Sequence, residues 1–257
     1  MDIVITAGGI PQPKDLLYTY TQGIPKALLE IAGKPMLQWI LDAVGSAQSI
    51  ERIVIVGPPE IQSLKTTKPV VYIPNTGEMF TNIRSGILKL LEIDPQPRQV
   101  AILSSDVPSI TGEIIDWIIN TANKTAAEIC YYAITRQVME KKFPNARRSY
   151  YWFKDVEVCG ADIHVVHTRL ITHRPDMWQR LLAVRKNAFN QAALIGYGTL
   201  FSFLFRLRTL ADTGIAVSRR LDVQGQVILC PYAEAGMDVD KPFQYDILSQ
   251  ELTRSKA

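Results

Sequence analysis

The sequence has few cysteines, and their spacing excludes the structures that cysteine usually builds in small proteins. Its 257 residues contain three, Cys130, Cys159 and Cys230. They are odd in number, far apart, and in neither CxxC nor Cys/His spacing, so we expect no disulfide framework and no zinc site. This usage fits a reducing compartment, and we expect a cytoplasmic protein.

The sequence also lacks a long hydrophobic run and a strong excess of one charge. Its most apolar stretch, residues 192–207, is shorter than a membrane-spanning helix and contains Arg206. We interpret it as a core helix, with a lipid contact as the alternative, and expect no membrane span and no secretory signal. The formal net charge of +3 suits a small anionic substrate but not a nucleic-acid partner, which needs clustered basic residues.

Through its first half, the sequence alternates short apolar runs with segments of helical period. Apolar residues recur at helical spacing after Pro35, from Phe80 to Leu91, and after Thr111, which can serve as an N-cap. Strands are expected at residues 2–6, 52–56, 70–73, 100–104 and 128–134. This alternation predicts an α/β fold with βαβ units around a mostly parallel sheet.

The second half departs from the alternation. Residues 147–166 are rich in aromatic and β-branched residues, which predicts antiparallel strands or a hairpin. From residue 175 to about 212 the pattern returns to helix, and a strand, a loop and a last helix are expected after it. Because no linker is evident, we expect a single domain over residues 1–257, with residues 147–212 forming a hairpin and a helical insertion.

The loop after the first strand has the residue types of a phosphate site. It begins with Ala7, Gly8 and Gly9 and continues through Lys14 to Lys26. Glycines let backbone N–H groups face an anion, and a lysine neutralises its charge. An ordinary strand-to-helix turn is the alternative. Ligands in open α/β sheets bind beyond the carboxyl ends of the strands, where this loop should lie.

Carboxylates that could hold a cation occur in two places. Asp106 follows the fourth strand in SSDVPS, and Asp238 and Asp240 stand two apart in MDVDKP, on one face if the segment is extended. If the end of the chain returns beside Asp106, these carboxylates meet and repel one another, which predicts a Mg²⁺ ion. The alternatives are a helix cap or turn at Asp106 and a solvated acidic turn near the C-terminus.

Other polar residues have more than one interpretation. After the third strand, Asn75, Thr76 and Gly77 can contact a nucleobase and ribose or form a capped loop. Arg147 and Arg148 are typical of a solvated face, although a phosphorylated acceptor would give them a role. Three histidines share no clear face with a carboxylate and are expected to be structural or exposed: His164, His167 and His173.

These segments, read in order, resemble the MobA-like nucleotidyltransferases, which include the sugar-phosphate nucleotidyltransferases and the enzymes that guanylylate molybdopterin. The resemblance covers nearly the whole chain. It rests on AGG at residues 7–9, PKALLEIAGKPML at 25–37, SSDVPSIT at 104–111 and MDVDKP at 237–242. It implies a Rossmann-like three-layer sandwich of the nucleotide-diphospho-sugar transferase type, with the helical insertion near the C-terminal part.

The resemblance also implies a reaction. A nucleoside triphosphate would transfer its NMP group to a phosphorylated small-molecule acceptor with release of pyrophosphate and with Mg²⁺ as cofactor. The glycine loop would wrap the triphosphate, and Lys26 would approach the α-phosphate. Asp106 and Asp240 would hold the metal, with Asp238 a weaker candidate. No protein nucleophile is required, which agrees with the absence of a convincing Ser/His/Asp or Cys/His set.

The remaining implied roles concern the base and the acceptor. The segment from Asn75, with Asn82, would contact base and ribose, while Gly160 and Asp162 would hold the acceptor, beside the segment 147–212. Relatives often use Gly with Asn there. The chain also has no arginine between Gly9 and Lys26, where relatives carry one after AGG; Lys14 could replace it.

Two other functions stay open at this stage. One is a nucleotide-sugar-dependent glycosyltransferase of a related fold, and the other is a catalytically silent nucleotide-binding regulator, which the missing arginine suggests. The base, the acceptor, the role of residues 175–212 and the oligomeric state, including a homo-oligomer, are not fixed by the sequence.

Overall fold

The structure is a computed structural model that describes residues 1–173 and 206–254. Its strands are β1 (Asp2–Thr6), β2 (Glu30–Ile31), β3 (Lys34–Pro35), β4 (Ile53–Gly57), β5 (Val70–Pro74), β6 (Gln99–Ser104), β7 (Ile129–Thr135), β8 (Tyr151–Trp152), β9 (Glu157–Gly160), β10 (Ile163–His167) and β11 (Gly225–Leu229). Its α-helices are α1 (Tyr18–Thr21), α2 (Met36–Ser46), α3 (Met79–Ile93), α4 (Gly112–Ala122), α5 (Arg136–Lys142), α6 (Thr168–His173), α10 (Leu210–Leu221) and α11 (Pro242–Arg254). The 3₁₀ helices are η1 (Lys26–Leu28), η2 (Pro59–Ser63) and η3 (Ala233–Gly236).

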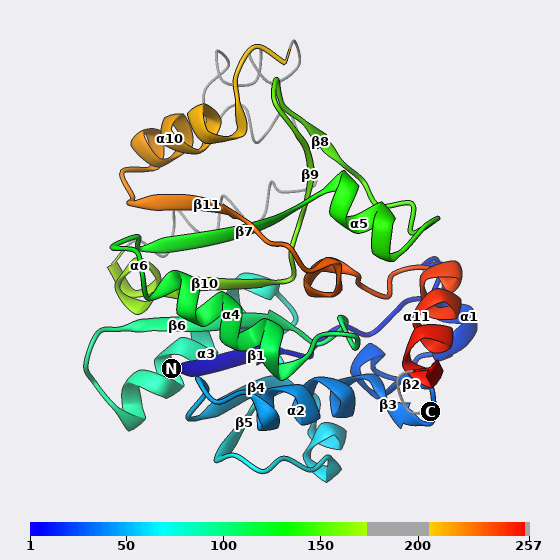
Figure 1. The fold of residues 1–257 in the computed structure, drawn as a ribbon. Coiled ribbons are helices and arrows are strands. Elements are labelled where there is room, and N and C mark those ends of the chain that lie inside the picture. The colour runs from blue at the N-terminus through cyan, green and yellow to red at the C-terminus, as the bar shows by residue number, and fades with distance from the viewer. Residues whose placement is uncertain (174–205, 255–257) are drawn as a thin grey trace.

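One large mixed sheet organises the described part of the chain (Figure 1). Its strand order is β5-β4-β1-β6-β10-β7-β9-β8, with β11 paired to β7. The first four of these strands are parallel, while β10 runs antiparallel to both β6 and β7. The carboxyl ends of β1, β4, β5 and β6 therefore lie at one edge of the sheet, where an α/β fold places its ligands.

Alternate residues of the central strands pack on opposite faces of the sheet. Ile3 and Ile5 of β1 belong to the core on the face covered by α2 and α4, whereas Val4 packs with Phe80 and Ile87 of α3 on the other face. Burial on both faces explains why these strands read as continuous apolar runs. The result is a Rossmann-like three-layer α/β fold with a mostly parallel centre.

Most expected elements of the first half are confirmed. The five strands appear as β1, β4, β5, β6 and β7, and the helices as α2, α3 and α4. The hydroxyl of Thr111 accepts a hydrogen bond from the N–H of Ile114, so Thr111 is the predicted N-cap of α4. The antiparallel hairpin in residues 147–166 is β8–β9. The short elements α1, η1, β2 and β3 were not expected, because runs this short carry no periodic signal.

The prediction for residues 175–212 lies mostly outside the described residues. Where the chain is described again, residues 206–209 are not helical, and α10 begins at Leu210 and continues to Leu221. The hydroxyl of Thr209 accepts from the N–H of Asp212, so a new helix starts where a helix was expected to end. The strand, loop and last helix expected after about residue 212 are confirmed as β11, the segment with η3, and α11, but α10 precedes them and was not expected. The single domain over residues 1–257 stays a prediction.

The end of the chain returns to the start of the fold. Tyr245 of α11 lies 4.7 Å from Tyr20 between ring centroids, and its hydroxyl donates to the carbonyl of Glu30 in β2 at 2.9 Å. This contact places the segment before α11 at the edge of the sheet that carries the loops (Figure 1). Among the described helices, none has the length and apolarity to cross a membrane.

Candidate active site

The loops after β1, β5 and β6 meet around one pocket. Thr6 is in register with Ser104, and the N–H of Ser105 donates to the carbonyl of Thr6 at 3.1 Å, so the residues that follow β1 and β6 are neighbours. The pocket is lined by Thr6, Gly8, Gly9, Lys26, Gly77, Met79, Asn82, Ser104, Ser105 and Asp106. It contains predicted residues from every one of these loops. Thr6, Met79, Ser104 and Ser105 were not predicted.

Asn75 fixes the shape of the glycine loop. Its Nδ2 donates to the carbonyl of Gly8 at 3.0 Å, and its Oδ1 accepts from the N–H of Gly77 at 2.9 Å and from Nδ2 of Asn82 at 2.8 Å. A Cβ on Gly8 would lie 2.4 Å from Oδ1 of Asn75. Glycine is therefore required at position 8, because three hydrogen bonds, with Gly8, Gly77 and Asn82, hold the side chain of Asn75 in place.

The predicted base-contacting residues form one hydrogen-bonded unit. The Oδ1 of Asn82 accepts from both the N–H and the hydroxyl of Thr76, at 2.9 and 2.8 Å. Gly77 has a φ of +91°, which favours glycine. Ala7, behind this unit, is fully buried, and its N–H donates to the carbonyl of Val56 at 2.7 Å. Of these residues, Gly77 and Asn82 line the pocket.

Lys26 lies at the far side of the pocket and joins two acidic loops. Its backbone N–H donates to the carbonyl of Gly9 at 2.9 Å, which ties the start of η1 to the glycine loop. Its Nζ donates to Oδ2 of Asp106 at 2.7 Å and to Oδ1 of Asp240 at 2.6 Å. Burial alone would lower the pKa of Lys26, but the charges of Asp106 and Asp240 raise it above its ordinary value.

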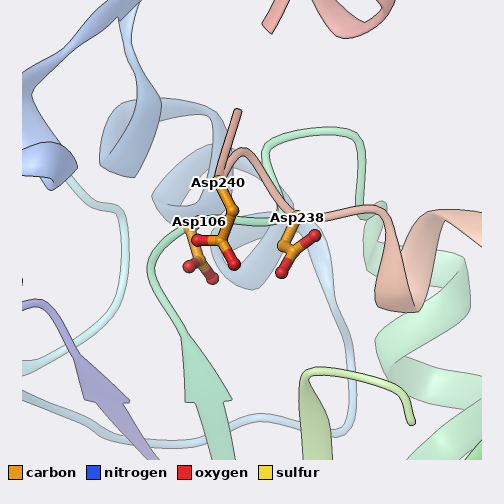
Figure 2. A group of neighbouring side chains, drawn as sticks. All are labelled: Asp106, Asp238 and Asp240. Atoms are coloured by element: carbon orange, nitrogen blue, oxygen red, sulfur yellow. The ribbon is translucent and has the colours of Figure 1, made fainter. Parts of the chain in front are cut away.

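The C-terminal acidic segment returns beside Asp106, as predicted. The N–H of Val239 donates to the carbonyl of Asp106 at 3.0 Å, and the N–H of Asp240 donates to Oε1 of Gln244 at 3.0 Å. Carboxylate oxygens of Asp106, Asp238 and Asp240 all lie within 4.8 Å of one another (Figure 2). The side chain of Asp240 is 60% exposed, whereas Asp238 is buried.

Arg148 is the partner of Asp238 and was not predicted as a site residue. Its Nη1 donates to Oδ1 of Asp238, and its Nη2 lies 3.9 Å from Oδ2 of Asp162. Gln244 Nε2 also donates to Oδ1 of Asp238, at 3.4 Å. The sequence grouped Arg148 with Arg147 as a solvated face. Arg147 is exposed, but Arg148 is not, and nothing in the local pattern distinguishes the two.

Gly160 and Asp162 lie on the other side of the acidic group. Burial, with a further contribution from the charge of Asp106, raises the pKa of Asp162 to about 7. Oδ2 of Asp162 is buried with no hydrogen-bond partner among the described residues. A Cβ on Gly160 would lie 2.5 Å from the hydroxyl of Tyr131, which is a partly exposed ring. Tyr131 therefore leaves no space for a side chain at position 160, and Asp162 has an unused acceptor oxygen beside the carboxylates.

The other predicted residues lie apart from the pocket. Lys14 is exposed and does not line it. His164 stacks on Tyr131 at 4.4 Å, its Nδ1 accepts from the N–H of Tyr132 at 3.2 Å, and burial lowers its pKa to about 4, so it is structural. The three cysteines are all buried and free. None of the three forms a disulfide, as the sequence predicted.

Two curated proteins are similar to part of the chain. A bifunctional protein GlmU of Thermoanaerobacter pseudethanolicus is 31% identical over 97 residues, which is 37% of this chain and 21% of that protein. A probable molybdenum cofactor guanylyltransferase of Pyrococcus horikoshii is 29% identical over 108 residues, 42% of this chain and 53% of that protein. The match therefore spans about a fifth and about half of the lengths of these relatives.

A solved structure and a family model cover more of the chain. A hypothetical transferase from Thermus thermophilus has a TM-score of 0.80 at 23% identity, covers 95% of this chain and 98% of its own, and shows that the two share a fold. The MobA-like NTP transferase domain matches residues 4–193, which include the glycine loop, Lys26, Asp106 and the Gly160 region. By this match, the chain belongs to the family of MobA-like NTP transferase domains.

Proposed function

We propose that the protein is a Mg²⁺-dependent nucleotidyltransferase that moves an NMP group from a nucleoside triphosphate to a phosphorylated small-molecule acceptor and releases pyrophosphate. The observation that supports this most directly is the position of Lys26. Its ammonium joins Asp106 and Asp240, from loops far apart in the sequence, at the border of a pocket lined by Gly8 and Gly9. A phosphate-shaped loop, a cation and two carboxylates are what such a transfer requires.

In this proposal the triphosphate lies along the glycine loop. The backbone of Gly8 and Gly9 lets N–H groups approach the phosphate oxygens without a side chain between them. A Cβ on Gly9 would meet no described residue within 4 Å, so that space is available to a ligand. Lys26 borders the same pocket and supplies the positive charge. Base and ribose would contact the unit of Asn75 and Asn82.

The residues present fit a divalent cation. Oδ1 of Asp106 is buried and has no hydrogen-bond partner among the described residues, so a carboxylate oxygen is left for a ligand. Asp106 and Asp240 would hold the ion, because Arg148 engages Asp238. Hard carboxylate oxygens are the ligands that Mg²⁺ prefers, and it usually keeps waters and bridges to phosphates. When bound, Mg²⁺ would screen the charge of the triphosphate and of the departing pyrophosphate.

The acceptor would enter from the side of Gly160 and Asp162. Oδ2 of Asp162 can accept a hydrogen bond from an acceptor hydroxyl, and Arg148 lies 3.9 Å from it with a buried Nε that lacks a partner among the described residues. An oxygen of the acceptor phosphate attacks the α-phosphorus. The bond from that phosphorus to the oxygen bridging to the β-phosphate breaks, and pyrophosphate leaves. A phosphate monoester is largely ionised at neutral pH, so no strong base is needed.

A pyrophosphate-release assay that covers every common nucleobase tests the proposal. The protein is incubated with each of the common nucleoside triphosphates, Mg²⁺ and a panel of sugar phosphates and other phosphorylated alcohols, and pyrophosphate is measured. At least one pair should release pyrophosphate, and Asp106→Asn should abolish the release. Asp42→Asn is the matched control, because Asp42 is an exposed aspartate of α2 that pairs with Lys34 of β3. Equal activity of the two variants would reject the assigned site.

The same assay separates the other functions. A glycosyltransferase would transfer the sugar from a nucleotide sugar to an acceptor without releasing pyrophosphate. A silent regulator would bind a nucleoside triphosphate in calorimetry but would not release pyrophosphate with any acceptor. Lys26 argues against both functions, since a lysine that joins the two carboxylates beside a glycine pocket has a task in transfer at the α-phosphate.

A further inference from the structure

The ammonium of Lys26 lies where a metal ion shared by Asp106 and Asp240 would lie. It is 2.7 Å from an oxygen of Asp106 and 2.6 Å from an oxygen of Asp240. We propose that Lys26 is the resident counter-ion of the divalent-cation position, so that the cation enters only together with the triphosphate, which takes over the lysine. This inference rests on the proposed function, because it concerns the cation and the triphosphate of that reaction.

A divalent cation held by Asp106 and Asp240 would lie beside the ammonium of Lys26, whether it used the unpaired Oδ1 of Asp106 or the oxygens that Lys26 already occupies. A cation of two charges beside the ammonium would repel it, and the protein has little water here to screen the repulsion, since the Lys26 side chain is 14% exposed. Entry of the cation therefore requires the ammonium to move. The backbone of Lys26 is fixed by its hydrogen bond to Gly9, so the movement is confined to the side chain.

A cation that entered alone would leave the lysine without a partner. Removing one member of a buried ion pair is strongly unfavourable, because the remaining charge stays buried and uncompensated. Lys26 also borders the pocket of Gly8 and Gly9, where the triphosphate would lie. A triphosphate there gives the ammonium new anionic oxygens within reach of its side chain, and it brings further oxygens for the cation. The triphosphate thus removes the obstacle to cation binding.

Charge explains why the cation belongs in the complex. Four aspartates meet here, Asp106, Asp162, Asp238 and Asp240, against the two cationic side chains Lys26 and Arg148. With all of them ionised, the cluster has two more negative than positive charges. Arg148 is committed to Asp238, together with Gln244, so it does not compete for Asp106 and Asp240. The position of the Lys26 side chain therefore controls whether Asp106 and Asp240 are accessible to the cation.

The first test measures Mn²⁺ binding to the nucleotide-free protein, with free Mn²⁺ followed by its electron paramagnetic resonance signal. Lys26→Met should bind Mn²⁺ at least about tenfold more tightly than wild type, within the 5- to 150-fold range of typical site coupling. Lys26→Arg keeps a cation between the carboxylates and should bind as weakly as wild type. Lys34→Met is the matched control, because Lys34 pairs with Asp42 away from the pocket.

The second test uses wild type alone, so it does not depend on a variant that folds. Inorganic tripolyphosphate serves as the probe because it has no base, and its own Mn²⁺ binding is subtracted from a protein-free titration. Tripolyphosphate should tighten the binding of Mn²⁺ to wild type, and Mn²⁺ should tighten the binding of tripolyphosphate by the same factor.

Two results would overturn the proposal. One is tight Mn²⁺ binding by wild type without tripolyphosphate, and the other is a folded Lys26→Met variant that binds Mn²⁺ no better than wild type. Neither measurement needs turnover. A protein that shows the expected coupling but releases no pyrophosphate with any triphosphate would reject the proposed function and leave this inference standing.

Discussion

The side chain of Asn75 holds the backbone of Gly8, which lines the pocket. Nδ2 of Asn75 donates to the carbonyl of Gly8 at 3.0 Å, and a Cβ on Gly8 would approach Oδ1 of Asn75 to 2.4 Å. Asn75 cannot swing away cheaply, because Gly77 and Asn82 also donate to its Oδ1. The next glycine, Gly9, has open space around it. Asn75 therefore requires a glycine at position 8, whereas no described residue requires one at position 9.

Gly8→Ala should destabilise the protein, because the new methyl group displaces Asn75 and breaks its hydrogen bonds. Overpacking of this kind costs about 1–3 kcal/mol of the free energy of unfolding. Gly9→Ala is the matched control and should change it by less than about 0.5 kcal/mol. Urea unfolding of the two variants measures the difference. Equal losses would show that Asn75 does not hold the loop.

Arg148→Met should be far more damaging than the loss of an exposed arginine. It leaves the buried Asp238 without its main partner, and breaking such a pair costs about 3–5 kcal/mol. Arg136→Met is the comparison and should cost far less, since Arg136 pairs with Glu140 and Glu157 at the surface, where water screens the charges. Chemical denaturation gives both values. Adding Asp238→Asn to Arg148→Met should recover part of the loss, and no recovery would contradict the pairing.

Asp162 should make stability depend on pH. Its pKa in the folded protein is about 7, above its ordinary value of 3.8. Between these values the folded state binds more protons than the unfolded state, so the free energy of unfolding falls as pH rises from about 4 to about 7. Asp162→Asn removes this contribution. The unfolding free energy of wild type minus that of Asp162→Asn should therefore decrease as pH rises through that window.

Local pattern predicted much of the fold. Strands such as β1 and β4 are continuous apolar runs, and the spacing of Phe80, Ile83 and Ile87 predicted α3 before its packing was known. Such signals lie within a few residues of one another. Antiparallel strands were predicted over residues 147–166, which include most of β10, but the place of β10 between β6 and β7 has no local signal, because its partners are set by long-range pairing. The start of α10 was missed although Thr209 and Asp212 are a normal helix start.

The candidate site shows the same division. Lys26, Asp106 and Asp240 could be proposed because each stands in a recognisable segment, and the topology brings them together. Arg148 could not, since its role depends on where Asp238 arrives after a long stretch of chain. Asn75 was predicted to contact a nucleotide, but its hydrogen bonds to the loop are visible only in three dimensions. Residues whose partners come from distant segments are thus the ones that a single sequence does not assign.

Asp240→Asn tests the exposed member of the carboxylate pair. Because Asp240 is 60% exposed, the substitution should leave the unfolding temperature nearly unchanged. It removes the negative charge beside Lys26 and one candidate ligand of the cation. The kcat for pyrophosphate release should therefore fall by at least about 10²-fold, which is the scale of losing one group that stabilises charge at a reacting centre. Asp246→Asn is the control, because Asp246 is exposed on α11 and accepts a hydrogen bond from the hydroxyl of Tyr20 at 3.4 Å. Higher Mg²⁺ should restore part of the rate in Asp240→Asn and none in Asp106→Asn, which loses the buried ligand. Equal rates for Asp240→Asn and Asp246→Asn would remove Asp240 from the site.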